Sequence, residues 1–270
     1  MPIRFSTPDL VRACLRALKP RTTGVFFTGG EPTQLSWLQG LLSEARDLGF
    51  QRIQMQSHAG RAADAGYAEA LVQAGLTAID VPIYGHTPEL HQVVTRTPGS
   101  FQRTLAGLEN LRSLGVQSVI HVTLFRSNLA HLEQILRFID EVGPNEAYLQ
   151  VTGETGPPGF FADAAPGPGE VARACLKAFD AYSPTTRIRL SDVVPCLVPA
   201  LEERVIRWQG EVELKAPALV LPYSEWLKVF SAGGTRSYGE DCGGCSIRDR
   251  CDGLPREILQ LHGERELSPI

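Results

Sequence analysis

Residues 25–32 read Val25-Phe26-Phe27-Thr28-Gly29-Gly30-Glu31-Pro32. A short apolar run ends at two glycines, which are followed by a carboxylate and a proline. This pattern is typical of a buried parallel strand whose C-terminal tip lies against something polar. Glycines allow the backbone to approach a ligand closely, and Pro32 stiffens the turn and can open the next helix. The stretch therefore predicts both a strand and a binding site at its tip.

Strands and helices are predicted to alternate on both sides of this stretch. Before it, Thr7-Pro8-Asp9 has the signature of a helix start, with Thr7 as the N-cap, so that the chain opens with a helix. After it, apolar periodicity predicts strands at 52–56, 78–84, 117–124 and 147–152 and helices at 35–48, 62–74, 100–114 and 132–139. Repeated strand–helix units predict a parallel sheet.

The pattern changes after residue 152. Residues 153–169 are rich in glycine and proline and are predicted to form a long loop, which one further helix follows at 170–182. Beyond this helix, only short β-like segments are indicated, at 187–190, 211–214 and 218–221. We therefore expect two domains, a (β/α) domain over residues 1–184 and a small C-terminal domain over residues 185–270.

The composition is that of an ordinary globular protein. Of the 270 residues, 43% are hydrophobic and 21% charged, and the formal net charge is −4. This charge gives no case for nucleic acid, whose binders usually carry a basic face. No apolar run approaches the ~20 residues of a membrane-spanning helix, and the N-terminus has no apolar signal region. We expect a cytoplasmic protein without nucleic-acid or membrane partners.

Six cysteines in a cytoplasmic chain of this size indicate metal binding or catalysis rather than disulfides. Cys14 and Cys175 lie in the apolar stripes of predicted helices, so we interpret them as core residues. Cys242, Cys245 and Cys251 instead form a C-x2-C-x5-C run in a polar, glycine-rich segment.

This run can direct three thiolates at one metal centre, because its glycines permit the backbone turns and the freed amides can donate to sulfur. A fourth ligand is predicted at Cys196, which lies in the same C-terminal segment in a non-helical context. Spacing alone does not distinguish zinc from an iron–sulfur cluster. A metal-free group of reduced cysteines is the third interpretation.

The sequence Gly29-Gly30-Glu31-Pro32 resembles the GGEP motif of the radical S-adenosylmethionine (SAM) superfamily. In that family the motif closes the second strand of a partial (β/α)6 barrel and holds the methionine amino group of SAM. The resemblance implies that Gly29, Gly30, Glu31 and Pro32 bind SAM. Glycine carbonyls and the Glu31 carboxylate are suitable acceptors for an ammonium group.

Further landmarks follow in the order of that family, over roughly residues 7–182. Ser57-His58-Ala59 lies where the family often has Thr-Asn-Gly after the third strand. Residues 79–85, with His91 and residues 97–101, resemble the fourth strand and its following loop. Asn128 is placed like the asparagine after the fifth strand. The resemblance thus implies Ser57, His58 and Asn128 as further cofactor-binding residues, whereas His121, within a strand, is expected to be structural.

The C-terminal cysteines resemble the auxiliary-cluster region of the SPASM and twitch subfamilies, where C-x2-C-x5-C contributes to an extra [4Fe-4S] cluster. The full SPASM pattern has another cysteine after a three-residue gap, where this chain has Pro255. The resemblance favours one auxiliary cluster, as in a twitch domain, and iron–sulfur over zinc. Its implied ligands are Cys196, Cys242, Cys245 and Cys251.

The sequence departs from the family in one respect. The C-x3-C-x2-C triad that holds the SAM-cleaving cluster should precede the first helix, but Cys14 has no partner at either spacing. Two hypotheses follow: a first strand with its cysteine loop is missing from the sequence given, or the protein is a natural degenerate that kept the barrel without the chemistry. We favour the first, because loss of the strand would leave residues 25–27 as an apolar sheet edge.

The expected fold is therefore α/β, a partial parallel barrel lacking its first strand and followed by a cysteine-rich domain. The expected function is that of a radical SAM iron–sulfur protein, in its complete form an oxidoreductase or an enzyme that modifies a peptide or small molecule. The resemblance also implies a reductase partner such as ferredoxin or flavodoxin. Two alternatives are a non-catalytic partner protein that binds a peptide at the barrel mouth, and a barrel protein with a structural zinc.

Overall fold

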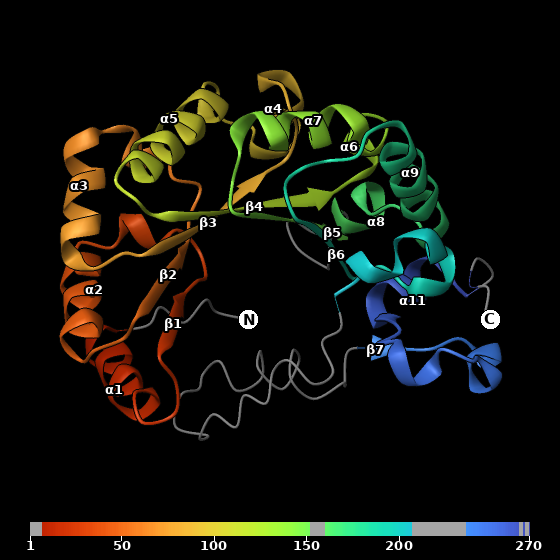
Figure 1. The fold of residues 1–270 in the computed structure, drawn as a ribbon, viewed down its shortest axis with the longest axis horizontal. Helices are drawn as coiled ribbons and strands as arrows, with labels where there is room; N and C mark the ends of the chain where they lie inside the picture. The colour runs from red at the N-terminus through yellow and green to blue at the C-terminus, as the bar shows by residue number, and fades with distance from the viewer. Residues whose placement is uncertain (1–6, 152–159, 207–235, 265–266, 268–269) are drawn as a thin grey trace. The chain divides into compact units, whose positions relative to one another are not determined.

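The computed structural model describes residues 7–151, 160–206, 236–264, 267 and 270, and Figure 1 draws its fold. The chain divides into two compact units. The first runs through Ile83 and includes Thr87–His121, and the second holds Tyr84–His86 and the described residues from Val122 onward. The domain boundary predicted at residue 184 stays a prediction. The predicted β-like segments at 211–214 and 218–221 lie outside the described residues.

A parallel sheet forms the core of the fold. Its six strands are ordered as they occur along the chain: β1 (Gly24–Phe27), β2 (Arg52–Gln56), β3 (Ala78–Ile83), β4 (Gln117–Leu124), β5 (Glu146–Val151) and β6 (Ile188–Ser191). Within the first unit β1, β2 and β3 are parallel, with Gln56 opposite Asp80. Within the second, β5 and β6 are parallel, so the segment predicted at 187–190 is a strand of this sheet. The predicted α/β fold is confirmed.

Helices connect the strands, and most lie where apolar periodicity predicts them. Their bounds are α1 (Pro8–Leu18), η1 (Pro32–Gln34), α2 (Leu38–Asp47), η2 (Gly60–Ala63), α3 (Ala65–Ala74), α4 (Pro88–Thr95), α5 (Ser100–Ser113), α6 (Arg126–Leu129), α7 (Leu132–Val142), α8 (Phe160–Ala164) and α9 (Pro168–Ala181). Beyond β6 the elements are short: η3 (Pro195–Leu197), η4 (Pro199–Arg204), β7 (Arg236–Ser237), η6 (Glu240–Gly244), η7 (Arg248–Arg250), β8 (Leu254–Pro255) and α11 (Arg256–His262).

Local capping explains where the helices begin. Thr7 is the N-cap of α1, as predicted: its hydroxyl accepts from the Leu10 N–H at 3.3 Å, and Pro8 occupies the first turn. Thr87 caps α4 in the same way, with Pro88 following it. The loop expected after β3 therefore contains a helix. The Thr-Pro-acidic signature recurs there, and it was available in the sequence.

Two further predictions differ from the structure. Pro32 opens the short 3-10 turn η1 rather than the following α-helix, which begins at Leu38. The Glu31 carboxylate accepts from the Thr33 N–H and so closes a tight turn directly after the strand. The stretch predicted as a loop at 153–169 contains α8.

The helices cover one face of the sheet in the first unit, where α1, α2, α3 and α5 lie on the same side of β1–β3 (Figure 1). The strands alternate accordingly. Ile53 and Met55 of β2 are at most 1% exposed, whereas Gln54 and Gln56 between and after them are only partly buried. Burial of the apolar residues under the helices is the main stabilising term of this unit.

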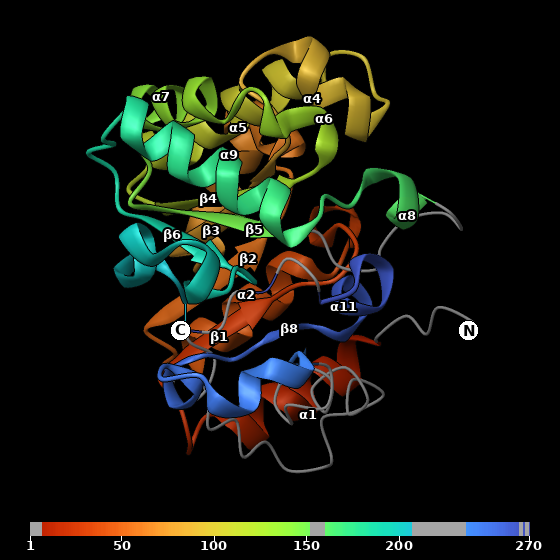
Figure 2. The same cartoon turned by 90° about the vertical axis from the view of Figure 1, so that its right-hand side faces the viewer.

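The second unit is built around α7 and α9, which lie side by side in Figure 2. Cys175 is fully buried on α9, and this burial raises the pKa of its thiol to about 12. The thiol therefore stays protonated, as expected for the core residue that the sequence predicts. Asp140 of α7 accepts hydrogen bonds from Tyr182, Thr185 and Thr186, which fixes the chain between α9 and β6.

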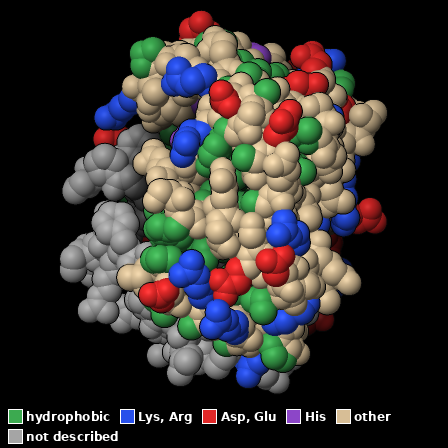
Figure 3. All heavy atoms as spheres, turned by 90° about the vertical axis from the view of Figure 1, so that its left-hand side faces the viewer, with side chains coloured by type: hydrophobic (Ala, Val, Ile, Leu, Met, Phe, Trp, Pro, Cys, Tyr) green, Lys and Arg blue, Asp and Glu red, His purple; other side chains and the backbone are tan. Residues whose placement is uncertain are grey.

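The surface carries no single-sign patch on the side shown in Figure 3, where acidic and basic side chains are interspersed. Within the described part of the chain, none of the helices combines the length and the apolar character needed to cross a bilayer.

His91 of α4 makes the stability of the first unit depend on pH. The side chain is 2% exposed and packs beside the Phe101 ring, with centroids 5.5 Å apart. Burial lowers its pKa from 6.5 to about 4. Between these pH values the unfolded chain binds a proton that the folded chain does not, so stability falls as pH falls. We expect the loss from pH 6.5 to pH 4 to include roughly 3 kcal/mol from this residue.

The measurement is urea unfolding at several pH values for the protein and for His91→Gln. The variant keeps a polar side chain of similar size but does not titrate, so its stability should fall less over this range. An identical pH dependence in both proteins would contradict the prediction.

Candidate functional site

The tip of β1 is an open turn of two glycines. Gly29 and Gly30 have φ angles of 93° and 52°, in the left-handed region that favours glycine. A Cβ placed on Gly30 would have no atom of the described residues within 4 Å, so this part of the chain leaves the backbone here open. This geometry would allow a ligand to approach the main chain of the turn, and the ligand site itself stays a prediction.

Glu31 fixes this turn to the next loop of the sheet. One carboxylate oxygen, Oε1, accepts from the Thr33 N–H at 3.0 Å, the Thr33 hydroxyl at 2.6 Å and the Ser57 hydroxyl at 2.7 Å. The other, Oε2, accepts from the His58 N–H at 3.1 Å and lies 3.1 Å from His58 Nε2. The Glu31 side chain is only 12% exposed. A buried carboxylate needs such donors, and here they come from the loops after β1 and β2.

The structure thus brings Glu31, Ser57 and His58 together, three residues that the sequence assigns to one site. Glu31 accepts directly from the Ser57 hydroxyl and from the His58 N–H. A carboxylate offers about four acceptor positions, and the protein donors already around Glu31 match that number. The carboxylate consequently acts as the support of the turn, while the glycine backbone forms its open surface.

Thr33, Arg61 and Tyr67 also belong to this candidate site, although the sequence does not predict them. Thr33 is 1% exposed, and its carbonyl oxygen accepts from the Arg61 guanidinium and from the Tyr67 hydroxyl. The Arg61 guanidinium also lies over the Tyr67 ring, 4.2 Å from its centroid. These contacts hold the turn after Pro32 against η2 and α3. The sequence does not predict these contacts, because they form through tertiary packing between residues about thirty positions apart.

Asn128 lies in the second unit and is fully buried. Its side-chain oxygen accepts from the Phe125 N–H at 2.9 Å, and its amide donates to the carbonyls of Tyr84 and Thr123 at 3.1 and 2.8 Å. The side chain therefore links the residue that follows β3 to the carboxyl end of β4. Its assignment to the cofactor site stays a prediction.

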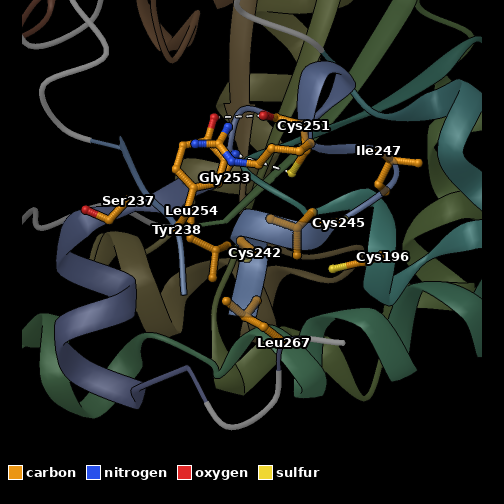
Figure 4. A pocket seen from close by; sticks show the side chains of 12 residues that line it. Cys196, Ser237, Tyr238, Cys242, Cys245, Ile247, Cys251, Gly253, Leu254 and Leu267 are labelled. Carbon is orange, nitrogen blue, oxygen red and sulfur yellow. Dashed lines mark hydrogen bonds between the residues drawn. The ribbon is translucent and has the colours of Figure 1, made fainter. Parts of the chain in front are cut away.

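The four C-terminal cysteines of the predicted metal centre line one small pocket of the second unit (Figure 4). Cys196 comes from η3, Cys242 from η6, Cys245 from the end of η6, and Cys251 from the residue after η7. All four are partly buried and none forms a disulfide. Apolar side chains complete the wall, among them Ile247, Leu254 and Leu267.

The thiols of this pocket influence one another electrostatically. Burial raises the pKa of the Cys251 thiol, and the neighbouring Cys196 and Cys242 raise it further, whereas the Gly253 N–H that donates to its sulfur at 3.4 Å lowers it. Neighbouring thiolates repel, so a metal cation is the group that would let them ionise together. Within the residues that the structure describes, no three His, Cys, Asp or Glu side chains already converge on one point as metal ligands do.

Hydrogen bonds and a stacked ring hold the cysteine segment in place. The Tyr238 hydroxyl donates to the Cys251 carbonyl at 2.8 Å, and the Arg248 guanidinium lies 3.1 Å from the Tyr238 ring centroid. Arg236 donates to the Gly253 carbonyl at 3.0 Å and pairs with Asp192 at the end of β6. The pocket is therefore attached to the sheet through a charged pair.

The thiolates of a SAM-cleaving cluster are absent from the sequence given. Cys14 is the single cysteine among the described residues of the first unit, and it lies on α1 with a pKa raised by burial. The residues present here do not fit that cluster, which requires three closely spaced thiolates.

Comparison with known proteins identifies the family. The sequence matches the family model described as the Radical SAM superfamily over residues 2–139, just over half of the chain. This protein therefore belongs to the radical SAM superfamily. Membership implies SAM and a [4Fe-4S] cluster as the cofactors of the family.

Curated relatives match part of the chain. An AdoMet-dependent heme synthase of Oleidesulfovibrio alaskensis is 29% identical over 119 residues, which are 44% of this chain and 30% of that protein. A 7,8-dihydro-6-hydroxymethylpterin dimethyltransferase of Methanocaldococcus jannaschii is 33% identical over 129 residues, 47% of this chain and 25% of that protein. The matched segments thus span less than a third of the length of these relatives.

Solved structures share the fold over nearly all of the chain. Native anSMEcpe with bound AdoMet superposes with a TM-score of 0.62 at 14% identity, over 97% of this chain and 84% of that one. SuiB of Streptococcus suis bound to S-adenosylmethionine superposes with a TM-score of 0.63 at 12% identity, over 96% and 69% of the two chains. A third match, SuiB bound to the precursor peptide SuiA, has a TM-score of 0.55 at 13% identity, over 69% and 43%.

Replacing Glu31 tests its role as the support of the turn. In Glu31→Gln, one acceptor oxygen becomes an NH2 group that faces N–H and O–H donors, so at least two hydrogen bonds are lost and donors are opposed. We expect a loss of about 1–3 kcal/mol in the free energy of unfolding. Amide hydrogen exchange should also become faster at residues 57–60.

Glu133→Gln is the matched control, because Glu133 is an exposed partner of Arg137 on α7. Its effect should stay within about 0.5 kcal/mol. Equal effects of the two substitutions would show that the Glu31 contacts do not support the turn.

Proposed function

We propose that this chain binds SAM at the tip of β1 and holds an auxiliary [4Fe-4S] cluster at its four C-terminal cysteines. In the complete protein it would belong to an enzyme that modifies a peptide or small-molecule substrate. The observation that carries the proposal is the turn at Gly29 and Gly30, open to a ligand on one side and held by the Glu31 carboxylate on the other.

The SAM site would be formed mainly by main-chain atoms. The ammonium group of SAM needs acceptors, and the carbonyl groups of the Gly29-Gly30 turn can provide them at the open side. Glu31 contributes by its negative charge and by fixing the turn, since its oxygens already accept from Thr33, Ser57 and His58. Pro32, Ser57 and His58 would then be positioning residues. Asn128 would keep the loops after β3 and β4 in place.

The cluster site would use Cys196, Cys242, Cys245 and Cys251. Thiolate donors suit iron–sulfur clusters and zinc, and the Gly253 N–H already lies 3.4 Å from the Cys251 sulfur. A bound iron–sulfur cluster would supply one-electron transfer. The protein would contribute burial and the Gly253 N–H bond to Cys251, both of which act on the charge of the centre.

Both substrate classes occur among similar proteins. The curated relatives are named for heme synthesis and pterin methylation, whereas SuiB was solved with a precursor peptide. This supports a peptide or small-molecule substrate and an oxidoreductase or group-transfer reaction in the complete protein. A cytoplasmic location and a ferredoxin or flavodoxin as electron donor complete the proposal.

Gly30→Ala tests the SAM site. The added methyl group would project into the open space at the turn, so we expect SAM to bind at least tenfold more weakly in isothermal titration calorimetry. The substitution also forces a left-handed conformation on alanine, which costs about 1 kcal/mol.

Gly115→Ala controls for this strain, since Gly115 at the end of α5 has a φ of 84° and likewise no atom within 4 Å of a Cβ. It should leave SAM affinity unchanged. Equal SAM affinity in Gly30→Ala and the parent protein would refute the site.

Anaerobic reconstitution with iron and sulfide tests the cluster. We expect the chain to take up about four iron atoms, with a brown colour, and a Cys242→Ser/Cys245→Ser double variant to take up none. Cys14→Ser, remote in sequence and on α1, should bind as much iron as the parent protein. Stoichiometric zinc without iron, measured by metal analysis, would instead establish the structural-zinc alternative.

A further inference from the structure

One face of the sheet in the first unit carries several polar residues, next to the apolar Phe26 and Ala78. Parallel strands are usually apolar on both faces because helices cover both. Among the described residues, the helices of this unit cover the face of Ile53, Met55, Ile79 and Val81, all at most 1% exposed. The residues that alternate with them are Arg52, Gln54 and Gln56 on β2, and on β3 they are Asp80 with the apolar Ala78 and Pro82. Polar residues on the second face of a parallel sheet are typical of a barrel interior that receives a ligand.

The amino end of this face carries an exposed hydrogen-bonded group. Arg52 of β2 donates from Nε to the Gln54 side chain at 2.9 Å and from Nη1 to the Gln117 side chain at 3.0 Å. The guanidinium therefore spans the strand between β2 and β4. Two of its N–H groups are thus hydrogen-bonded to side-chain amide oxygens at the amino end of the face.

The carboxyl end of the same face carries a second polar row, next to the glycine turn. Thr28 donates to the Gln56 side chain at 2.6 Å, and Gln56 stands opposite Asp80 in the β2–β3 register. On the next strand, His121 directs Nδ1 toward Asp80 Oδ1 at 3.6 Å. The row thus runs from the residue before the turn to an acid–imidazole pair.

Asp80 is the unusual member of this row. It is 8% exposed, and its Oδ1 atom is buried without a hydrogen-bond partner among the described residues. A buried carboxylate oxygen without a hydrogen-bond partner is energetically unfavourable. The His121 Nδ1 atom is the polar group that faces it, and a movement of less than 1 Å would bring the two atoms to hydrogen-bond distance. Such pairs are often long without ligand and shorten when it binds.

We propose that Asp80 holds the His121 imidazole in the Nδ1–H tautomer, so that Nε2 serves as a proton acceptor for the substrate on the polar face. Nδ1 is buried, whereas 20% of the His121 side chain remains exposed, so the exposed part of the ring lies away from Asp80. The hydrogen bond that one ring nitrogen makes determines the protonation of the other. Asp80 is a positioning residue in this arrangement, and His121 is the residue that would touch the substrate.

The inference rests on the proposed function, because it takes the polar face beside the glycine turn as the substrate side. The substrate class is a molecule with a dissociable N–H, O–H or S–H group. In the step, the proton of this group moves to His121 Nε2 and its bonding electron pair stays on the substrate. The resulting imidazolium is stabilised by the Asp80 carboxylate, so that charge is balanced within the pair.

The tautomer can be measured without substrate, SAM or iron. Two-bond 1H–15N correlation spectra of the 15N-labelled chain at pH 8 distinguish a protonated from an unprotonated ring nitrogen, and His121→Gln assigns the signal among the six histidines. We expect Nδ1 of His121 to be protonated and Nε2 unprotonated. In Asp80→Asn this preference should be lost, and in Asp80→Glu it should be retained at least in part. Asp180→Asn, on the exposed side of α9, should leave it unchanged.

Access to Nε2 is measured by carbethoxylation with diethyl pyrocarbonate, followed by mass spectrometry of the His121 peptide. We expect modification of His121 at Nε2 in the parent protein and a severalfold slower reaction in Asp80→Asn. An Nε2–H tautomer in the parent protein, an unchanged tautomer in Asp80→Asn, or an unreactive His121 would each overturn the proposal. SAM titration of the same samples tests the proposed function separately, because neither measurement on His121 depends on SAM binding.

Discussion

The hydrogen bonds accepted by the Glu31 carboxylate are the interactions on which the candidate site depends. Glu31 lies one residue beyond an open glycine turn and accepts from Thr33, Ser57 and His58. A turn built on Gly29 and Gly30 has little conformational preference of its own, because glycine adopts positive and negative φ angles with similar energies. The hydrogen bonds to Glu31 select one conformation. Preorganisation of a flexible segment lowers the entropy lost when a ligand binds.

The two candidate sites lie in different units of the chain. The first unit holds the open turn and the polar face of the sheet, and the second holds the cysteine pocket and its Arg236–Asp192 attachment to β6. In both, a charged side chain that is mostly buried joins residues distant in sequence. Such contacts contribute specificity of geometry more than net stability, since desolvation offsets much of their attraction.

The sequence predicts the sheet well because its signals are local. The apolar run of β1 and the helix start at Thr7 depend on neighbours within a few residues, and β2 and β4 have the predicted bounds. The family also follows from a local motif, Gly29 to Pro32. The sequence does not reveal which residues each polar side chain contacts through hydrogen bonds or ion pairs. The sequence does not show that Glu31 accepts from Ser57 and His58 or that His121 lies beside Asp80, because these contacts arise from strands brought together only by folding.

The alternation along β2 has a consequence for folding itself. If β2 paired with β3 one residue out of register, Gln54 and Gln56 would be buried beneath the helices, and Ile53 and Met55 would be turned to the polar face. Each misplaced amide and each exposed apolar side chain would destabilise that arrangement. The polar residues of this face therefore also destabilise a misaligned sheet.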